Sequence, residues 1–116
     1  MNPELIKFLF SPLQEIQLDL TNMCNLRCPM CYISYFKFKK RGFLDYALFR
    51  KIINELFEIN AYVEMIKLYW IGEPLLHPQF ARMLEYIFFK KSKRNWFRHT
   101  MTSTNGLALD LSLIHI

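Results

Sequence analysis

Apolar residues recur at two different spacings along the chain, one typical of strands and one typical of helices. The strand segments number three. Residues 13–20 (LQEIQLDL) alternate apolar and polar after Leu13, and residues 64–71 (EMIKLYWI) form a second, mostly apolar run. Both patterns are typical of strands. Residues 99–104 (HTMTST) are rich in β-branched Thr and predict a third strand.

Apolar residues at helical spacing separate these strands. Asp45 is a predicted N-cap for a helix that runs to about Glu58, and Pro78 fits the first position of a helix that ends near Lys91. A third helix is expected to begin near Leu107. The predicted buried stripes are Leu48, Phe49, Ile52, Ile53, Leu56 and Phe57 in the first helix, and Phe80, Met83, Leu84, Ile87 and Phe88 in the second.

The resulting order of strand, helix, strand, helix, strand predicts an α/β fold with a parallel sheet. Ligands of such sheets bind at the carboxyl ends of the strands. Three turn-rich segments follow the three strands: a cysteine loop after the first, residues 72–74 (GEP) after the second, and residues 104–106 (TNG) after the third. We therefore expect these distant segments to meet at one edge of the sheet.

Composition narrows the class of protein. The 116 residues make one small domain or part of a larger one, and a hydrophobic content of 53% excludes a disordered polar tail. No apolar run is long enough to span a membrane. The longest early run, residues 8–10, is too short for the apolar core of a signal peptide, so we expect a cytoplasmic protein.

The net charge of +5 gathers partly in two clusters, residues 37–41 (KFKKR) and 90–94 (KKSKR). Such clusters can bind phosphate backbones, but they are more often solvated turns and helix ends. No recognised nucleic-acid module accompanies them, so we do not expect nucleic acid as a partner.

Three cysteines, Cys24, Cys28 and Cys31, carry the clearest chemical signal, with the spacing C-x3-C-x2-C. An odd number at such short spacing is a poor disulfide framework. Thiolates suit zinc or an iron–sulfur cluster. A structural zinc ion needs four ligands, and the histidines lie far along the chain. A [4Fe–4S] cluster held by three cysteines leaves one iron open for a substrate or cofactor.

Three motifs resemble those of the radical S-adenosylmethionine (radical SAM) superfamily. Residues 21–32 (TNMCNLRCPMCY) resemble its cluster loop, and residues 71–78 (IGEPLLHP) resemble its second motif at the end of the second strand. Residues 103–106 (STNG) are similar to the segment that closes the third strand in many members. The resemblance implies a low-potential one-electron donor and a [4Fe–4S] cluster that binds S-adenosylmethionine at its open iron. It also implies a 5′-deoxyadenosyl radical that abstracts hydrogen from a substrate.

The resemblance also implies site residues. Cys24, Cys28 and Cys31 would be the metal ligands. Met30 lies where the family often has a residue that touches the adenine, and Gly72 and Glu73 would accept the cofactor's ammonium. Asn105 would line the cofactor cavity or only form a turn. The family often has two glycines before the glutamate, whereas here Trp70 and Ile71 precede a single glycine.

The family core is a partial barrel of six β/α units, of which this sequence predicts three. We therefore expect the N-terminal half of a larger enzyme, inactive by itself, with an extension at 1–12, a partial core at 13–110 and a tail at 111–116. The tail is either native or translated adapter sequence. The sequence does not identify the substrate. We expect a peptide or a small molecule. The alternative function is a binding module stabilised by zinc or an iron–sulfur cluster, whose basic clusters grip nucleic acid or phosphate.

Overall fold

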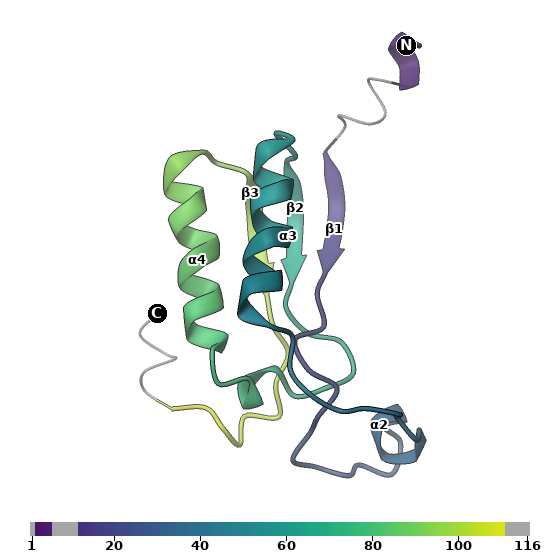
Figure 1. Cartoon of the computed structure of the whole chain (residues 1–116). Coiled ribbons are helices and arrows are strands. Elements are labelled where there is room, and N and C mark those ends of the chain that lie inside the picture. The colour runs from purple at the N-terminus through teal and green to yellow at the C-terminus, as the bar shows by residue number, and fades with distance from the viewer. Residues whose placement is uncertain (1, 6–11, 111–116) are drawn as a thin grey trace.

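A computed structural model describes residues 2–5 and 12–110 of the chain. Three strands form one parallel sheet in the order β1 (Leu13–Gln17), β2 (Val63–Lys67) and β3 (Phe97–Met101). Leu13 lies opposite Val63, and Val63 lies opposite Phe97. The arrowheads of all three strands in Figure 1 point toward the same end, where the loops gather. The predicted α/β class and parallel sheet are confirmed.

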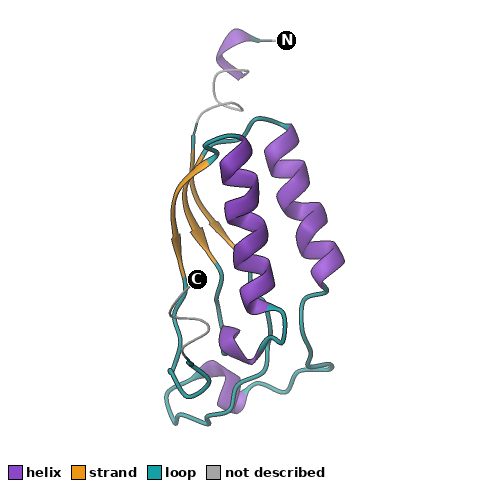
Figure 2. Ribbon diagram, turned by 90° about the vertical axis from the view of Figure 1, so that its left-hand side faces the viewer, coloured by secondary structure: helices purple, strands orange, loops and turns teal. Residues whose placement is uncertain are grey.

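Two long helices, α3 (Tyr46–Glu58) and α4 (Phe80–Lys93), connect the strands. They lie side by side on one face of the sheet (Figure 2). The helix α3 begins as predicted, because an Asp45 carboxylate oxygen accepts a hydrogen bond from the Ala47 N–H at 3.3 Å. Two short elements lie among the loops, the helix α2 (Tyr32–Tyr35) and the 3-10 turn η1 (Pro74–Leu76).

The core lies between the sheet and the two long helices. It consists of Leu20, Phe49, Ile53, Val63, Ile66, Leu68, Phe80, Met83, Ile87, Trp96 and Phe97. Most of the predicted helical stripes therefore face the sheet. Leu48 and Phe88 are not buried as predicted, because they are 47% and 45% exposed, although the Phe88 ring packs edge-on against Phe97 of β3.

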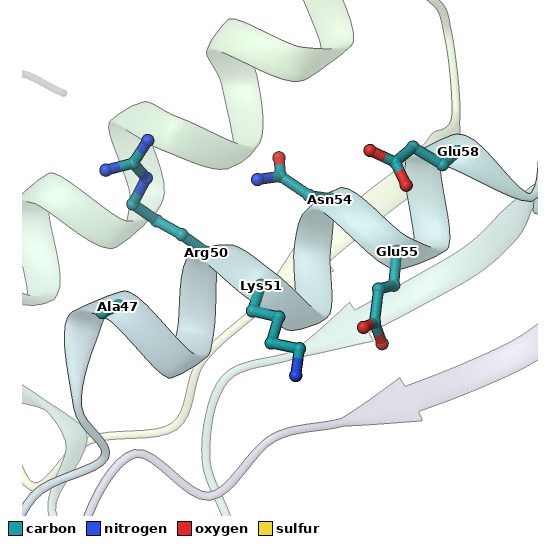
Figure 3. A pocket seen from close by; sticks show the side chains of 6 residues that line it. All are labelled: Ala47, Arg50, Lys51, Asn54, Glu55 and Glu58. Carbon is teal, nitrogen blue, oxygen red and sulfur yellow. The ribbon is translucent and has the colours of Figure 1, made fainter.

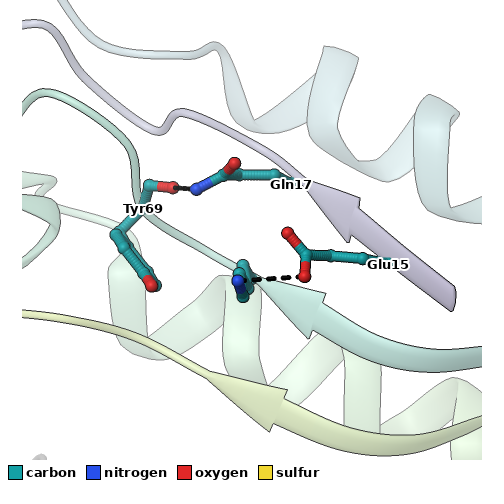
Figure 4. A network of polar contacts seen from close by, with 4 residues as sticks. Glu15, Gln17 and Tyr69 are labelled. Atoms are coloured by element: carbon teal, nitrogen blue, oxygen red, sulfur yellow. Dashed lines mark hydrogen bonds and ion pairs between the residues drawn. The ribbon is translucent and has the colours of Figure 1, made fainter.

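The other face of the sheet carries polar side chains. Strand alternation places Ile16 and Ile66 toward the helices, so Glu15, Gln17 and Lys67 point away from them. The Lys67 ammonium lies 2.9 Å from a Glu15 carboxylate oxygen, and the Gln17 amide donates to the Tyr69 carbonyl at 2.8 Å (Figure 4). These contacts tie β1 to β2 on the side that no described helix covers.

The structure corrects several predicted boundaries. The first two strands end at Gln17 and Lys67, three and four residues before the predicted ends, and β3 begins two residues early, at Phe97. The helix expected near Leu107 is a turn. The tail at 111–116 and most of the extension at 1–12 lie outside the described residues. Among those described, no helix is both long and apolar enough to cross a membrane.

Candidate functional site

A loop that contains all three cysteines follows β1 at the carboxyl end of the sheet. Cys24, Cys28 and Cys31 are free thiols, and each is partly exposed. The backbone turns back on itself within the motif, because the Cys31 N–H donates to the Cys28 carbonyl at 3.0 Å. The helix α2 starts immediately after Cys31, so the motif is bounded by a strand before it and a helical turn after it.

The chain that returns toward α3 holds the base of this loop. The Thr21 hydroxyl donates to the Gly42 carbonyl at 2.7 Å. The Thr21 hydroxyl oxygen also accepts from the Met23 N–H at 3.1 Å. The Asn22 side chain donates to the Lys40 carbonyl and accepts from the Gly42 N–H, both at 2.8 Å. These bonds satisfy backbone groups on both segments and fix where the loop leaves the sheet.

Two arginines, one outside the loop and one within it, donate hydrogen bonds to carbonyls of the loop. The Arg41 guanidinium donates to the carbonyls of Asn22 and Ile33 at 3.3 and 3.2 Å. The exposed Arg27 donates to the carbonyls of Cys24 and Leu26, both at 2.8 Å. Both side chains thus bind loop carbonyls.

The second segment packs directly against the cysteine loop. A Cβ atom at Gly72 would lie 2.0 Å from the Thr21 carbonyl oxygen and 2.9 Å from the Met23 carbonyl oxygen, so no larger residue fits. The next residue, Glu73, donates its N–H to the Met23 carbonyl at 2.8 Å. Gly72 is therefore required by the packing, because only a residue without a side chain lets the segment after β2 contact the cysteine loop.

Asp19, which the sequence analysis did not single out, joins the same two segments. Burial raises the pKa of its carboxyl above the usual value, and hydrogen bonds from the backbone at Thr21, Ile71 and Gly72 offset part of that rise. Its position offered a signal, because an acidic residue directly after a strand faces the ligand-binding edge of a parallel sheet.

The third segment is tied to the second by one buried carboxylate. Glu73 is 3% exposed. One of its oxygens accepts from the Leu75 N–H at 3.2 Å and from the Thr104 hydroxyl, and the other accepts from the Asn105 N–H at 2.8 Å. The expected ammonium acceptor therefore uses both oxygens inside the protein.

Asn105 completes the meeting of the three segments. Its side-chain amide donates to the Asn25 side-chain oxygen Oδ1 at 2.8 Å, and the amide nitrogen lies 3.8 Å from the Cys24 sulfur. These contacts join positions 80 and 81 residues apart. The prediction that the ends of the three strands converge at one edge is confirmed.

The three sulfurs themselves are not gathered around a point. Among the residues that the structure describes, no group of three or more His, Cys, Asp or Glu side chains is arranged to hold a metal ion. A [4Fe–4S] cluster would need the three sulfurs around one centre, which this arrangement does not provide. The donor set still fits an iron–sulfur cluster in its chemistry, because three free thiols on one loop can reorient by side-chain rotation.

Met30 and His77, two further residues near the site, differ in exposure. Met30 is 85% exposed, so its thioether is available beside the cysteines. His77 is buried, with one ring nitrogen 2.7 Å from the Leu44 carbonyl, and the other accepts from the Gln79 N–H at 3.0 Å. Because both nitrogens are engaged, His77 holds the turn before α4 and is not available as a metal ligand.

One surface groove lies near the site, and another lies far from it. One, of about 340 Å³, lies at the base of the cysteine loop. Its lining is Asp19, Thr21, Asn22, Lys40, Gly42, Phe43 and Leu44. The other, of about 360 Å³, runs along α3 and is lined by residues of that helix alone, Ala47 to Glu58 (Figure 3). The second groove is remote from the cysteines in the fold and takes no part in the site.

Two curated proteins match most of the chain. The tungsten-containing aldehyde ferredoxin oxidoreductase cofactor-modifying protein of Pyrococcus furiosus is 35% identical over 97 residues, which are 84% of this chain and 25% of that protein. The GTP 3′,8-cyclase of Synechocystis sp. is 29% identical over 102 residues, 87% of this chain and 29% of the cyclase. The chain thus spans about a quarter of the length of these relatives, which is less than the half expected from the sequence.

Solved structures show the same fold. BtrN in complex with AdoMet and 2-DOIA superposes with a TM-score of 0.75 at 22% identity, over 90% of this chain and 41% of BtrN. BtrN in an open conformation gives a TM-score of 0.73 at 20% identity, over 90% of this chain and 44% of BtrN. The sequence model of the radical SAM superfamily matches residues 18–115. The chain belongs to the radical SAM superfamily, whose enzymes use a [4Fe–4S] cluster and S-adenosylmethionine.

Proposed function

We propose that the chain is the cofactor-holding N-terminal part of a radical SAM enzyme. Cys24, Cys28 and Cys31 would ligate three irons of a [4Fe–4S] cluster, and S-adenosylmethionine would bind at the remaining iron. The chemistry that these groups supply when bound is hydrogen abstraction by a 5′-deoxyadenosyl radical. The observation that carries the proposal is the convergence of the three strand-end segments around the cysteine loop.

The protein's own residues position this chemistry. Glu73 and Asp19 are partly or wholly buried carboxylates that accept hydrogen bonds from backbone groups of neighbouring segments. Asp19 holds the Gly72 turn against the loop, and Glu73 ties that turn to the segment after β3, so the backbone there would border the methionyl end of the cofactor. Met30 and Asn105 would border the same site from the loop and from the segment after β3. Such fixed positioning supplies a large share of an enzyme's rate enhancement.

We propose an acidic electron carrier as the one-electron donor. Between Asp19 and Asp45 the sequence contains no acidic residue. That stretch holds five cations, namely Arg27, Lys37, Lys39, Lys40 and Arg41. Four of them are exposed: Arg27 within the loop that would hold the cluster, and Lys37, Lys39 and Lys40 beside it. A cationic surface attracts an acidic protein and speeds its encounter.

The core region described here does not identify the substrate of the enzyme. The relative from Pyrococcus furiosus is named for modifying a cofactor and the relative from Synechocystis sp. for cyclising GTP. Because these names differ while both relatives match the same region, we propose that this region supplies the radical chemistry. Selection of a peptide or small-molecule substrate would then depend on other parts of the enzyme.

Anaerobic reconstitution with iron and sulfide tests the assignment. We expect about four irons and four sulfides per chain and a broad visible absorption from thiolate-to-iron charge transfer. S-adenosylmethionine should then perturb the spectrum of the cluster, because it would bind an iron directly. A colourless protein that retains zinc would overturn the proposal in favour of a metal-stabilised binding module.

A further inference from the structure

Asn105 reaches the sulfur of Cys24 from a strand end 81 residues later in the chain, at 3.8 Å from amide nitrogen to sulfur. We infer that Asn105 donates a hydrogen bond to this sulfur and thereby raises the reduction potential of the cluster. This inference rests on the proposed function, since it requires Cys24 to be a ligand. It assigns to Asn105 a role in tuning the cluster rather than in holding S-adenosylmethionine.

The orientation of the Asn105 amide is fixed by its other contacts. Its side-chain oxygen accepts from the Leu107 N–H at 3.0 Å, so the amide nitrogen must be the atom that faces the cysteine loop. That nitrogen has two hydrogens. One is directed at the Asn25 oxygen at 2.8 Å, which leaves the other for the Cys24 sulfur.

Glu73 is the residue that positions Asn105. Its buried carboxylate accepts from the Asn105 N–H at 2.8 Å and from the Thr104 hydroxyl. Both residues on the third segment are therefore anchored to the second segment, which is itself bonded to the loop through the Met23 carbonyl. The contact between Asn105 and Cys24 closes this ring of three segments.

Cys24 differs from the other two cysteines in the donors around it. Its sulfur also accepts from the Leu26 N–H at 3.4 Å. Within residues 12–110, hydrogen bonds to a cysteine sulfur reach Cys24 alone. Reduction adds negative charge to a cluster and its thiolates, and N–H dipoles that point at a sulfur stabilise that charge. Loss of the Asn105 donor should therefore make the cluster harder to reduce.

The test is the midpoint potential of the reconstituted full chain, followed by electron paramagnetic resonance during a redox titration. Asn105→Ala removes the donor without adding charge. Asn54→Ala is the matched control, because Asn54 lies on α3 and accepts from the Tyr86 hydroxyl away from the loop. We expect a more negative potential in Asn105→Ala and an unchanged potential in the control.

Iron content separates the possible failures. If the parent chain holds no cluster, the proposed function itself fails. If Asn105→Ala holds about four irons at the parent's potential, the inference fails while the proposed function stands. If Asn105→Ala loses the cluster, Asn105→Ser is measured instead, because its hydroxyl oxygen can still accept from the Leu107 N–H and the substitution adds no charge. A more negative potential in that variant supports the inference, and an unchanged one overturns it.

Discussion

Gly72 lies so close to Thr21 that a Cβ atom on the glycine would sit 2.0 Å from the threonine carbonyl oxygen. The contact involves backbone on both sides, so no side-chain rotation can relieve it. The second motif and the start of the cysteine loop are thus packed together at the level of the main chain.

Gly72→Ala should therefore separate the two segments. We expect a loss of about 1–3 kcal/mol or more in the free energy of unfolding, which is typical of overpacking, together with weaker retention of iron. Urea unfolding and iron analysis would measure the two effects. Gly42→Ala is the control, since a Cβ there would meet nothing within 4 Å. Equal stability of the two variants would contradict the proposed close packing.

Cysteine and histidine substitutions distinguish a three-cysteine cluster from a site with a histidine ligand. Cys28→Ala should reduce bound iron to background, because a cubane needs all three thiolates here. His77→Ala should keep the cluster, although it removes two hydrogen bonds and should lower stability by roughly 1–3 kcal/mol. Iron and sulfide analysis after reconstitution checks both. Loss of the cluster in folded His77→Ala would revive a Cys3His site.

Asp19 should make stability depend on pH. Burial holds its pKa above the ordinary value of 3.8 in the folded chain, so its contribution to stability is largest below that pH and is lost as pH rises through the folded pKa. Asp19→Asn removes this pH-dependent loss of stability. It also changes the free energy of unfolding through altered hydrogen bonds, but by an amount that does not vary with pH. The free energy of unfolding of Asp19→Asn minus that of the parent should therefore rise from acidic to neutral pH.

Denaturant titrations across that pH range would measure the difference. A constant or falling difference would show that Asp19 is not the titrating group.

Charge reversal at Lys37, Lys39 and Lys40 should slow reduction by an acidic electron carrier. We expect the association rate to fall roughly tenfold or more at low ionic strength and to converge with the parent as salt is added. Stopped-flow reduction of the reconstituted cluster measures this. Reversal of Lys90, Lys91 and Lys93 at the far end of α4 makes the same change in charge and serves as the control. Equal effects of the two sets would argue for net charge rather than docking.

The 116-residue chain alone should not sustain turnover. In the described part of the chain β3 pairs only with β2, so one side of β3 is an open edge. The relatives are also far longer, since the chain spans 25% and 29% of them. Reconstituted and reduced chain should release at most a small amount of 5′-deoxyadenosine from S-adenosylmethionine. Repeated turnovers by the isolated chain would disprove this expectation.

Local signals in the sequence were sufficient for the elements but not for their exact ends. The N-cap at Asp45 and the helix to Glu58 are as predicted, because both depend on short-range hydrogen bonds and spacing. The start of β3 at Phe97 was missed because it is set by pairing with Val63, which no local pattern encodes. The expected helix near Leu107 was wrong, since the Asn105 side chain and Gly106 form a turn there instead.

The location of the site in the fold could be predicted from the sequence, but the hydrogen-bond partners of its carboxylates could not. Parallel topology alone brings the cysteine loop, Glu73 and Asn105 to one edge. The use of the Glu73 carboxylate inside the protein could not be read from the sequence, because it depends on how deeply the side chain is buried. The same holds for Asp19, whose partners come from a segment some 50 residues away.

The contact between Cys24 and Asn105 spans 81 residues, and this separation sets an order of events during synthesis. At about 5–20 residues per second, the ribosome adds Asn105 roughly 4–16 seconds after Cys24. For most of that interval the nascent chain carries all three thiols but lacks the strand end that closes the ring around them. A metal that arrives early therefore meets an open, flexible loop, whereas one delivered later meets the assembled edge of the sheet. We therefore expect stable cluster binding only after translation has passed β3.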